Sequence, residues 1–141
     1  LHVEIQVGEV GPKSEPKNQH ADLLPLNVHV IVVHLGLIPA SRVRQVQQLH
    51  QYIAREVPID APLLVAGDFN DWGNRITNMM RAQHLTEHEG TKHPTYPSRL
   101  PMVQLDHVYA KGLIPVSQMV PHGKIWQRMS DHLPLLAQFD L

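Results

Sequence analysis

Apolar and polar residues alternate in LHVEIQV, residues 1–7, which predicts a strand with one buried face. Residues 27–35, NVHVIVVHL, are rich in β-branched side chains and predict a strand buried on both faces. Between them, residues 8–25 are rich in proline, glycine and charge and predict a long loop. The chain therefore begins with two strands joined by a loop.

Apolar positions then recur every three or four residues over 42–57, which predicts an amphipathic helix with Ser41 as its N-cap. The apolar run 63–67 predicts a short buried strand, and a second helical pattern covers 74–84. Residues 89–101 have the composition of a loop. Three more strands are expected at 105–110, 114–120 and 134–141.

These elements follow the order ββαβαβββ, which predicts an α/β fold with helices on one face of one sheet. Two helices are few to cover strands that are apolar on both faces. We therefore expect part of the sheet to expose an apolar face, and exposed faces of that kind usually meet a partner.

Composition narrows the class of protein. With 141 residues, 43% of them hydrophobic and 18% charged, the chain is expected to form one globular domain. The net charge of −1 gives no basic excess of the kind that marks nucleic-acid binding, although a local basic patch would not show in this number. The absence of cysteine excludes disulfides and thiolate metal sites.

The sequence shows no targeting signal. No apolar run approaches the ~20 residues that a membrane-spanning helix needs. The first residues, LHVEIQVGEV, lack a signal-peptide pattern, so we expect a cytoplasmic protein. The same residues open in a strand pattern without an initiator methionine, which leads us to expect that the chain begins within a domain.

The first candidate for chemistry is the motif GDFND, which directly follows the predicted strand LLVA and places Asp68 and Asn70 two residues apart. If the strand geometry continues, both side chains point to the same side. A carboxylate can bind a hard cation or accept a proton from water, and a carboxamide can donate to an anionic oxygen. Asp, Asn and Gly are also ordinary turn residues, so a plain strand-to-loop turn explains the motif equally well.

Further polar residues lie at other strand ends. Asp131 could bind a metal and His132 could act as a general base or stabilise negative charge, with an Asx turn as the alternative. Asp106 needs a partner such as an imidazolium if it is buried, and is otherwise a surface residue of an edge strand. His34 ends the run VIVVH, where a histidine is more often structural than catalytic. Because active sites in α/β proteins gather at strand ends, the set points to one site.

In this order, His34 in VVHLGL, then GDFND, LDHVYAKG and SDHLPL resemble the endonuclease/exonuclease/phosphatase superfamily. That superfamily includes pancreatic-type deoxyribonuclease, abasic-site endonucleases, neutral sphingomyelinases and inositol polyphosphate 5-phosphatases, and TYPSRLPMVQLDHVYAKGL most resembles a bacterial subgroup. The resemblance implies a four-layered α/β/β/α sandwich with mixed, mostly antiparallel sheets, of which residues 1–141 are the C-terminal half. The absent half would supply the second sheet and the family's metal-binding glutamate.

The resemblance also implies roles for the strand-end residues. Asp68 would orient or deprotonate the attacking water, and Asn70 would hydrogen-bond the scissile phosphate. His132, held by Asp106, would contact the phosphate and assist the nucleophile, so Asp68 and His132 are both candidates for the base. His34 would hydrogen-bond a phosphate oxygen or assist the leaving group.

By the same resemblance, Asp131 would help to bind Mg²⁺ or Mn²⁺, which would stabilise the charge that builds up on oxygen during phosphodiester cleavage. The chain departs from the family pattern at His107, where an arginine or aromatic residue is common, and at Gln104, where a basic residue often lies. Both departures could weaken phosphate contacts. Trp72 and Tyr96 could stack on a substrate base, although ordinary loop packing is the commoner role for such residues.

Two functions are compatible with these patterns. The first is a metal-dependent phosphoester hydrolase acting on nucleic acid, phospholipid or a small phosphodiester. The second is a catalytically incomplete half-domain that dimerises, or meets the absent half, through its exposed sheet face.

Overall fold

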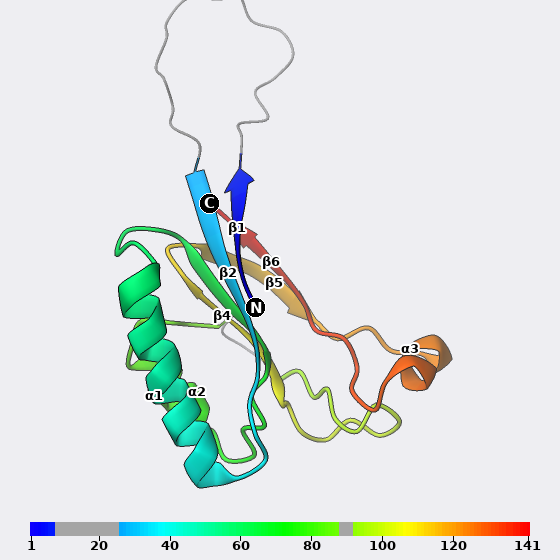
Figure 1. The fold of residues 1–141 in the computed structure, drawn as a ribbon. Helices are drawn as coiled ribbons and strands as arrows, with labels where there is room; N and C mark the ends of the chain where they lie inside the picture. Colours follow the sequence, from blue (N-terminus) through cyan, green and yellow to red (C-terminus); the bar gives the residue numbers. More distant parts are fainter. Residues whose placement is uncertain (8–25, 88–91) are drawn as a thin grey trace, which may run out of the picture.

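A computed structural model describes residues 1–7, 26–87 and 92–141 (Figure 1). The predicted loop at 8–25 lies outside the described residues, as does the start of the predicted loop at 89–101. The elements in chain order are β1 (His2–Val7), β2 (Leu26–His34), α1 (Pro39–Glu56), β3 (Leu63–Asp68), α2 (Arg75–Arg81), β4 (Asp106–Lys111), β5 (Ile114–Met119), α3 (Lys124–Met129) and β6 (Leu136–Asp140). Every strand and helix expected from the sequence is present.

The strands form two sheets, not the single sheet predicted. In the first sheet β1, β2, β3 and β4 lie in that order, with β2 and β3 parallel and the other neighbours antiparallel. β5 and β6 form a separate antiparallel pair. The mixed α/β class was correctly predicted. The number of sheets was not, because alternation along one strand does not identify that strand's partner.

α1 and α2 cover one face of the four-stranded sheet, and the main core lies between them and the strands (Figure 1). Ile31, Val65 and Tyr109 from three neighbouring strands pack in one cluster with Val46 of α1 and Met80 of α2. Full burial of a side chain such as isoleucine, valine or methionine contributes about 1.5–3 kcal/mol to the stability of the fold. This cluster therefore fixes the helices on the sheet and keeps the strand ends in place.

α1 begins earlier than predicted. Pro39 opens the helix, because its fixed φ suits the first turn and its missing N–H is not needed there. Ser41 therefore lies inside the first turn, and the prediction that it caps the helix was wrong; Ile38 takes the N-cap position without a side-chain hydrogen bond. The buried Arg42 donates to the carbonyl of Leu37 and so holds the loop that leads into α1.

The other face of the four-stranded sheet is partly open. β5 and β6 lie on this side (Figure 1), yet Val3, Ile5 and Val32 remain 39%, 50% and 44% exposed. The predicted apolar exposure is therefore present along β1 and β2. The prediction that β2 is buried on both faces was wrong at Val32, because in the described residues no helix covers this side of the strand.

α3 was not predicted, because a helix of six residues is too short for helical periodicity to show, and none of its residues is buried. It lies beside the segment that leads into β6 (Figure 1). Among the described residues, no helix is both long and apolar enough to cross a membrane.

Candidate active site

Three of the predicted residues form a row across one end of the four-stranded sheet. The register pairs His34 of β2 with Asp68 of β3, and Asp68 with Asp106 of β4. Paired residues point to the same face, so all three side chains lie on the face opposite α1 and α2. Gly67 permits the close strand approach beside them, because its φ is +140° and a Cβ there would lie 1.9 Å from the carbonyl oxygen of Val33.

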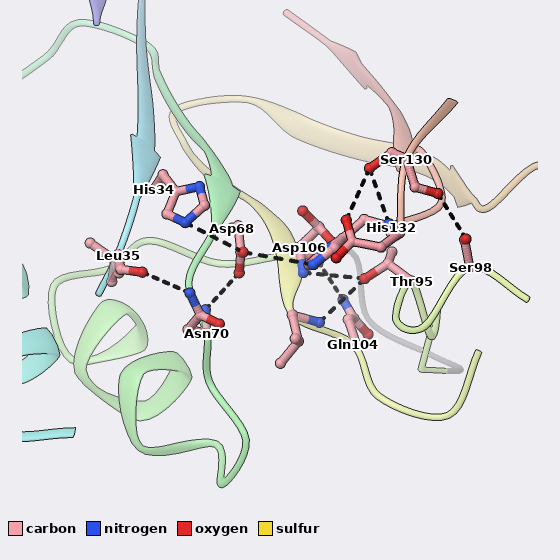
Figure 2. Close-up of polar contacts among 12 residues, drawn as sticks. His34, Leu35, Asp68, Asn70, Thr95, Ser98, Gln104, Asp106, Ser130 and His132 are labelled. Carbon is pink, nitrogen blue, oxygen red and sulfur yellow. Dashed lines mark hydrogen bonds and ion pairs between the residues drawn. The ribbon is translucent and has the colours of Figure 1, made fainter. Parts of the chain in front are cut away.

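A cavity of about 480 Å³ lies at this end of the sheet. The row opens into it, together with side chains from the loops that follow β3 and precede β6 (Figure 2). All the residues that the sequence analysis selected line this cavity: His34, Asp68, Asn70, Trp72, Tyr96, Asp106, Asp131 and His132. Residues nearly 100 positions apart in the sequence thus meet in one place.

Asp68 and Asn70 are locked together by the turn that follows β3. Asn70 has a left-handed φ of +48°, and its backbone N–H donates to Asp68 Oδ1 at 2.8 Å. The Asn70 carboxamide donates to the carbonyl of Leu35 at 2.7 Å, and the residue is only 4% exposed. The turn directs Asp68 Oδ2 toward two imidazoles: it lies 3.9 Å from His34 Nε2 and 4.0 Å from His132 Nε2. The motif can therefore form an ordinary turn and also take part in a functional site.

His132 is held by Asp106, as the resemblance implied. Its Nδ1 lies 2.7 Å from Asp106 Oδ2 and its Nε2 lies 4.0 Å from Asp68 Oδ2 (Figure 2). Partial burial by itself lowers the pKa of this imidazole. The hydrogen bond to Asp106 and the charges of Asp106, Asp68 and Asp131 outweigh burial, so the pKa of His132 is raised above its ordinary value. The site therefore favours an imidazolium.

Thr95 and Ser98, which the sequence analysis did not select, tie the loops of the site together. The Thr95 hydroxyl is fully buried and accepts from the backbone N–H of Leu105 and of Asp106, at 3.3 and 3.4 Å. Ser98 donates through its hydroxyl to the Ser130 carbonyl at 2.8 Å. Serine and threonine in a loop resemble ordinary turn residues, so the sequence carried no signal for this function.

Two aromatic side chains form one wall of the cavity. The ring of Tyr96 lies 4.9 Å from that of His132, and Trp72 packs edge-on against Tyr96 at 5.9 Å between ring centroids. Tyr96 therefore packs against side chains of the two neighbouring loops, in line with the more ordinary of the two interpretations. Trp72 remains 57% exposed and presents free ring surface.

The site offers oxygen ligands for a metal but not a complete set. Asp131 is exposed at the cavity, and carboxylate oxygens are the ligands that Mg²⁺ and Mn²⁺ prefer. Within residues 1–7, 26–87 and 92–141, however, no group of three or more His, Asp or Glu residues is placed to hold a metal ion. The donor type fits a hard divalent ion, and the described residues would supply part of its coordination shell.

Residues 6–132 match the sequence model of the Endonuclease/Exonuclease/phosphatase family. The chain belongs to this family. It is 34% identical over 119 residues to the uncharacterized protein YbhP of Escherichia coli K12, an alignment that covers 81% of this chain and 47% of YbhP. The chain thus spans about half the length of this curated relative.

Solved structures agree on the endonuclease/exonuclease/phosphatase fold. A family protein from Leptotrichia buccalis superimposes with a TM-score of 0.67 at 14% identity, covering 99% of this chain and 54% of that one. A functionally unknown conserved protein from Enterococcus faecalis gives 0.64 at 19% identity, covering 98% and 64%. At these identities the likeness supports the fold alone, including the interpretation of this chain as part of an α/β sandwich.

Proposed function

We propose that the protein is a metal-dependent phosphoester hydrolase whose active site is the cavity at the end of the four-stranded sheet. The observation that carries the proposal is the arrangement of His132 between two carboxylates, 2.7 Å from Asp106 and 4.0 Å from Asp68. Family membership supports it, since the family consists in general of metal-dependent phosphoester hydrolases. The expected substrates are nucleic acids, phospholipids or small phosphodiesters in the cytoplasm.

Asp68 is the residue that we assign to the attacking water. Its Oδ1 is occupied by the Asn70 N–H, while Oδ2 faces the cavity and can orient a water and take up its proton. The water oxygen then bonds to phosphorus, and the bond from phosphorus to the leaving oxygen breaks. A proton from His132, or from solvent, neutralises the leaving oxygen.

His132 is assigned to the phosphate because its Nδ1 is held by Asp106 and its Nε2 faces the cavity beside Asp68, where an imidazolium would donate to a phosphate oxygen. Of the two candidate bases we choose Asp68, because its Oδ2 accepts no hydrogen bond among the described residues and faces the cavity. The Asn70 carboxamide donates one of its two hydrogens to the Leu35 carbonyl, and we assign the second hydrogen to a phosphate oxygen. His34, whose side chain is 78% exposed, adds a further donor beside the phosphate or the leaving group.

A divalent metal ion bound through Asp131 is also part of the proposed mechanism. Asp131 would hold Mg²⁺ or Mn²⁺, and the ion would neutralise charge on the phosphate oxygens. Since the described residues lack a group of three ligands, the other ligands would come from outside them, in the half of the domain that the family resemblance places upstream. The chain would then be the C-terminal half of one such domain.

A second candidate function rests on the open sheet face. Val3, Ile5 and Val32 expose apolar surface on β1 and β2, and the chain spans about half the length of its curated relative. A catalytically incomplete half-domain that dimerises through this face, or binds the other half of its domain there, would fit both observations. The mass of the chain in solution tests the dimer directly.

Hydrolysis of bis(p-nitrophenyl) phosphate tests the first function. In the complete domain, with the upstream half present, we expect turnover with Mg²⁺ or Mn²⁺, none with EDTA, and a loss of about 100-fold or more in Asp68→Asn and His132→Ala. Gln51→Ala, an exposed amide on α1 away from the cavity, is the control and should retain full activity. A complete, folded domain without metal-dependent turnover would overturn the hydrolase.

A further inference from the structure

The last residue of the motif GDFND, Asp71, has no part in the mechanism proposed above. It is only 5% exposed and does not line the cavity of the candidate active site, although its neighbours Asn70 and Trp72 do. Within the described residues, no lysine, arginine or histidine forms an ion pair with its carboxylate. A buried charge of this kind is costly unless hydrogen-bond donors hold it. The donors around Asp71 therefore indicate its role.

Asp71 is held from α2 and, through α2, from β4. Its Oδ2 accepts from the backbone N–H of Thr77 at 2.9 Å and from the Thr77 hydroxyl at 3.1 Å. The same hydroxyl lies 2.9 Å from that of Tyr109. Because a carboxylate only accepts, Thr77 gives its one hydroxyl hydrogen to Asp71 and accepts from Tyr109. Burial raises the pKa of Tyr109 well above its ordinary value, so this hydroxyl keeps the hydrogen that it donates.

Part of this arrangement caps α2. Asn74 takes the N-cap position with a left-handed φ of +59° and makes no side-chain cap hydrogen bond. Asp71 instead satisfies a backbone N–H of the first turn. Capping does not require the second step, in which the Thr77 hydroxyl connects Asp71 to a strand. That step joins the loop after β3 to β4, the strand that begins with Asp106.

Tyr109 also holds the residue on the other side of Asn70. The buried ring of Phe69 packs edge-on against the ring of Tyr109, with 5.0 Å between the ring centroids. Asn70 therefore lies between two residues that reach the same tyrosine, one by ring packing and the other by hydrogen bonds. Both flanking residues belong to the motif GDFND.

His107, one of the two departures from the family pattern, belongs to the same layer. Its ring stacks on that of Tyr109, with 5.4 Å between centroids and 8° between planes, and its Nδ1 lies 2.9 Å from Glu87 Oε2. Neither His107 nor Gln104, the other departure, lines the cavity of the candidate active site. The expectation that they would alter phosphate contacts is therefore not supported by their position. His107 helps instead to hold Tyr109.

The backbone of Asn70 depends on such support. Its φ of +48° is uncommon for a residue with a side chain, and a conformation of this kind persists where the surroundings fix it. One amide hydrogen of Asn70 is bound to the Leu35 carbonyl at 2.7 Å. The direction of the second, which we assign to a phosphate oxygen, depends on the backbone angles that the flanking residues fix.

We propose that Asp71 is a positioning residue that holds the Asn70 carboxamide toward the phosphate. It does so by tying the loop after β3, through Thr77 and Tyr109, to the strand that begins with Asp106. This inference rests on the hydrolase function proposed above. Asp71 does not touch the substrate, since it lies outside the cavity, and it acts through the backbone that it shares with Asn70.

The carboxamide signals of Asn70 in ¹⁵N NMR spectra of the complete domain report its position without turnover, and their loss in Asn70→Gly identifies them. We expect both signals to move in Thr77→Val, which removes the hydroxyl seven positions away but keeps the backbone N–H. Thr77→Ser keeps the hydroxyl and should leave the signals near their wild-type positions. Tyr109→Phe, which keeps the packed ring, should move them in the same direction as Thr77→Val. Thr86→Val, the same change at an exposed threonine, is the control and should not move them.

Kinetics show whether Asp71 acts through Asn70. In the complete domain, Asp71→Ala should lower kcat/KM for bis(p-nitrophenyl) phosphate by about 10-fold, because the phosphate donor loses its alignment. In an Asn70→Gly background, where glycine accepts the left-handed φ but offers no carboxamide, the same change should cost less than about 2-fold. Asp60→Ala, an exposed carboxylate before β3, is the control and should retain full activity.

The outcomes separate this inference from the proposed function. An equal loss of kcat/KM from Asp71→Ala in both backgrounds would mean a general structural effect and would overturn the inference. Asn70 signals that stay in place in both Thr77→Val and Tyr109→Phe would overturn it too, and metal-dependent turnover would still support the hydrolase. Signals that move in a complete domain without turnover would remove the hydrolase and retain Asp71 as the residue that positions Asn70.

Discussion

Asp106 Oδ2 and His132 Nδ1 lie 2.7 Å apart although the two residues are separated by 26 positions in the sequence. The contact requires that Nδ1 carries a hydrogen, because a carboxylate only accepts. Nε2 is therefore the ring atom that faces Asp68 and the cavity. One carboxylate thus orients the imidazole, and the other shares with it the space where we place the phosphate.

The first prediction concerns this pair. In Asp106→Asn the hydrogen bond to a charged acceptor is lost, so the pKa of His132 should fall toward the ordinary histidine value of about 6.5. Activity should fall by about 100-fold to 1,000-fold, since the ring loses its fixed orientation. Titration of the imidazole by NMR measures the first effect. Asp140→Asn on β6, outside the cavity, should change neither, and an unshifted His132 in Asp106→Asn would refute the assignment.

The second prediction is a pH dependence of stability. Burial of His132 opposes its protonation, but the hydrogen bond to Asp106 and the nearby carboxylates prevail, so its pKa is higher folded than unfolded. The stabilisation is then complete below the unfolded value of about 6.5 and disappears as pH rises through the folded value. The difference in free energy of unfolding between wild type and His132→Gln should therefore become smaller as the pH increases from about 6.5 through the folded pKa of His132. Urea unfolding across the range checks it, and a difference that grows with pH would contradict the assigned direction.

The sequence was sufficient to predict that the candidate residues lie together, because they mark strand ends. His34, Asp68 and Asp106 each interrupt an apolar run, and strand pairing alone aligns three such interruptions in a row. The partner expected for Asp106 was also found, in His132. These features depend on local pattern and on one chemical requirement, that a half-buried carboxylate needs a donor.

What the sequence could not show depends on contacts between distant segments. The pairing of β5 with β6 is a choice between partners, and the fully buried hydroxyl of Thr95 has the same sequence signature as an ordinary loop residue. A cavity of about 810 Å³ that is lined in part by Gln104 and Gln118 is of the same kind, since these residues come from a loop and from β5. Tertiary packing creates such features, and the periodicity of the sequence does not indicate which distant segments pack together.

The third prediction tests Thr95 as a positioning residue. Thr95→Val keeps the shape but removes the acceptor for the N–H groups of Leu105 and Asp106, so the free energy of unfolding should fall by about 2 kcal/mol. Because one of these groups belongs to Asp106, activity should fall by about 10-fold and the pKa of His132 should shift as its partner moves. Thr95→Ser keeps the hydroxyl and should retain most of the stability and most of the activity. Equal behaviour of the two variants would mean that the hydroxyl has no part in holding Asp106.

The fourth prediction concerns the glycine next to Asp68. In Gly67→Ala the new Cβ would lie 1.9 Å from the backbone oxygen of Val33, which cannot move without breaking the pairing of β2 with β3, and the φ of +140° disfavours any side chain. We expect a loss of about 3–5 kcal/mol in the free energy of unfolding, measured by urea denaturation. Gly73→Ala is the matched control: no atom lies within 4 Å of its added Cβ, and the change should stay within about 0.5 kcal/mol. If the two variants proved equally stable, the close approach of β2 and β3 that aligns His34 with Asp68 would not depend on glycine.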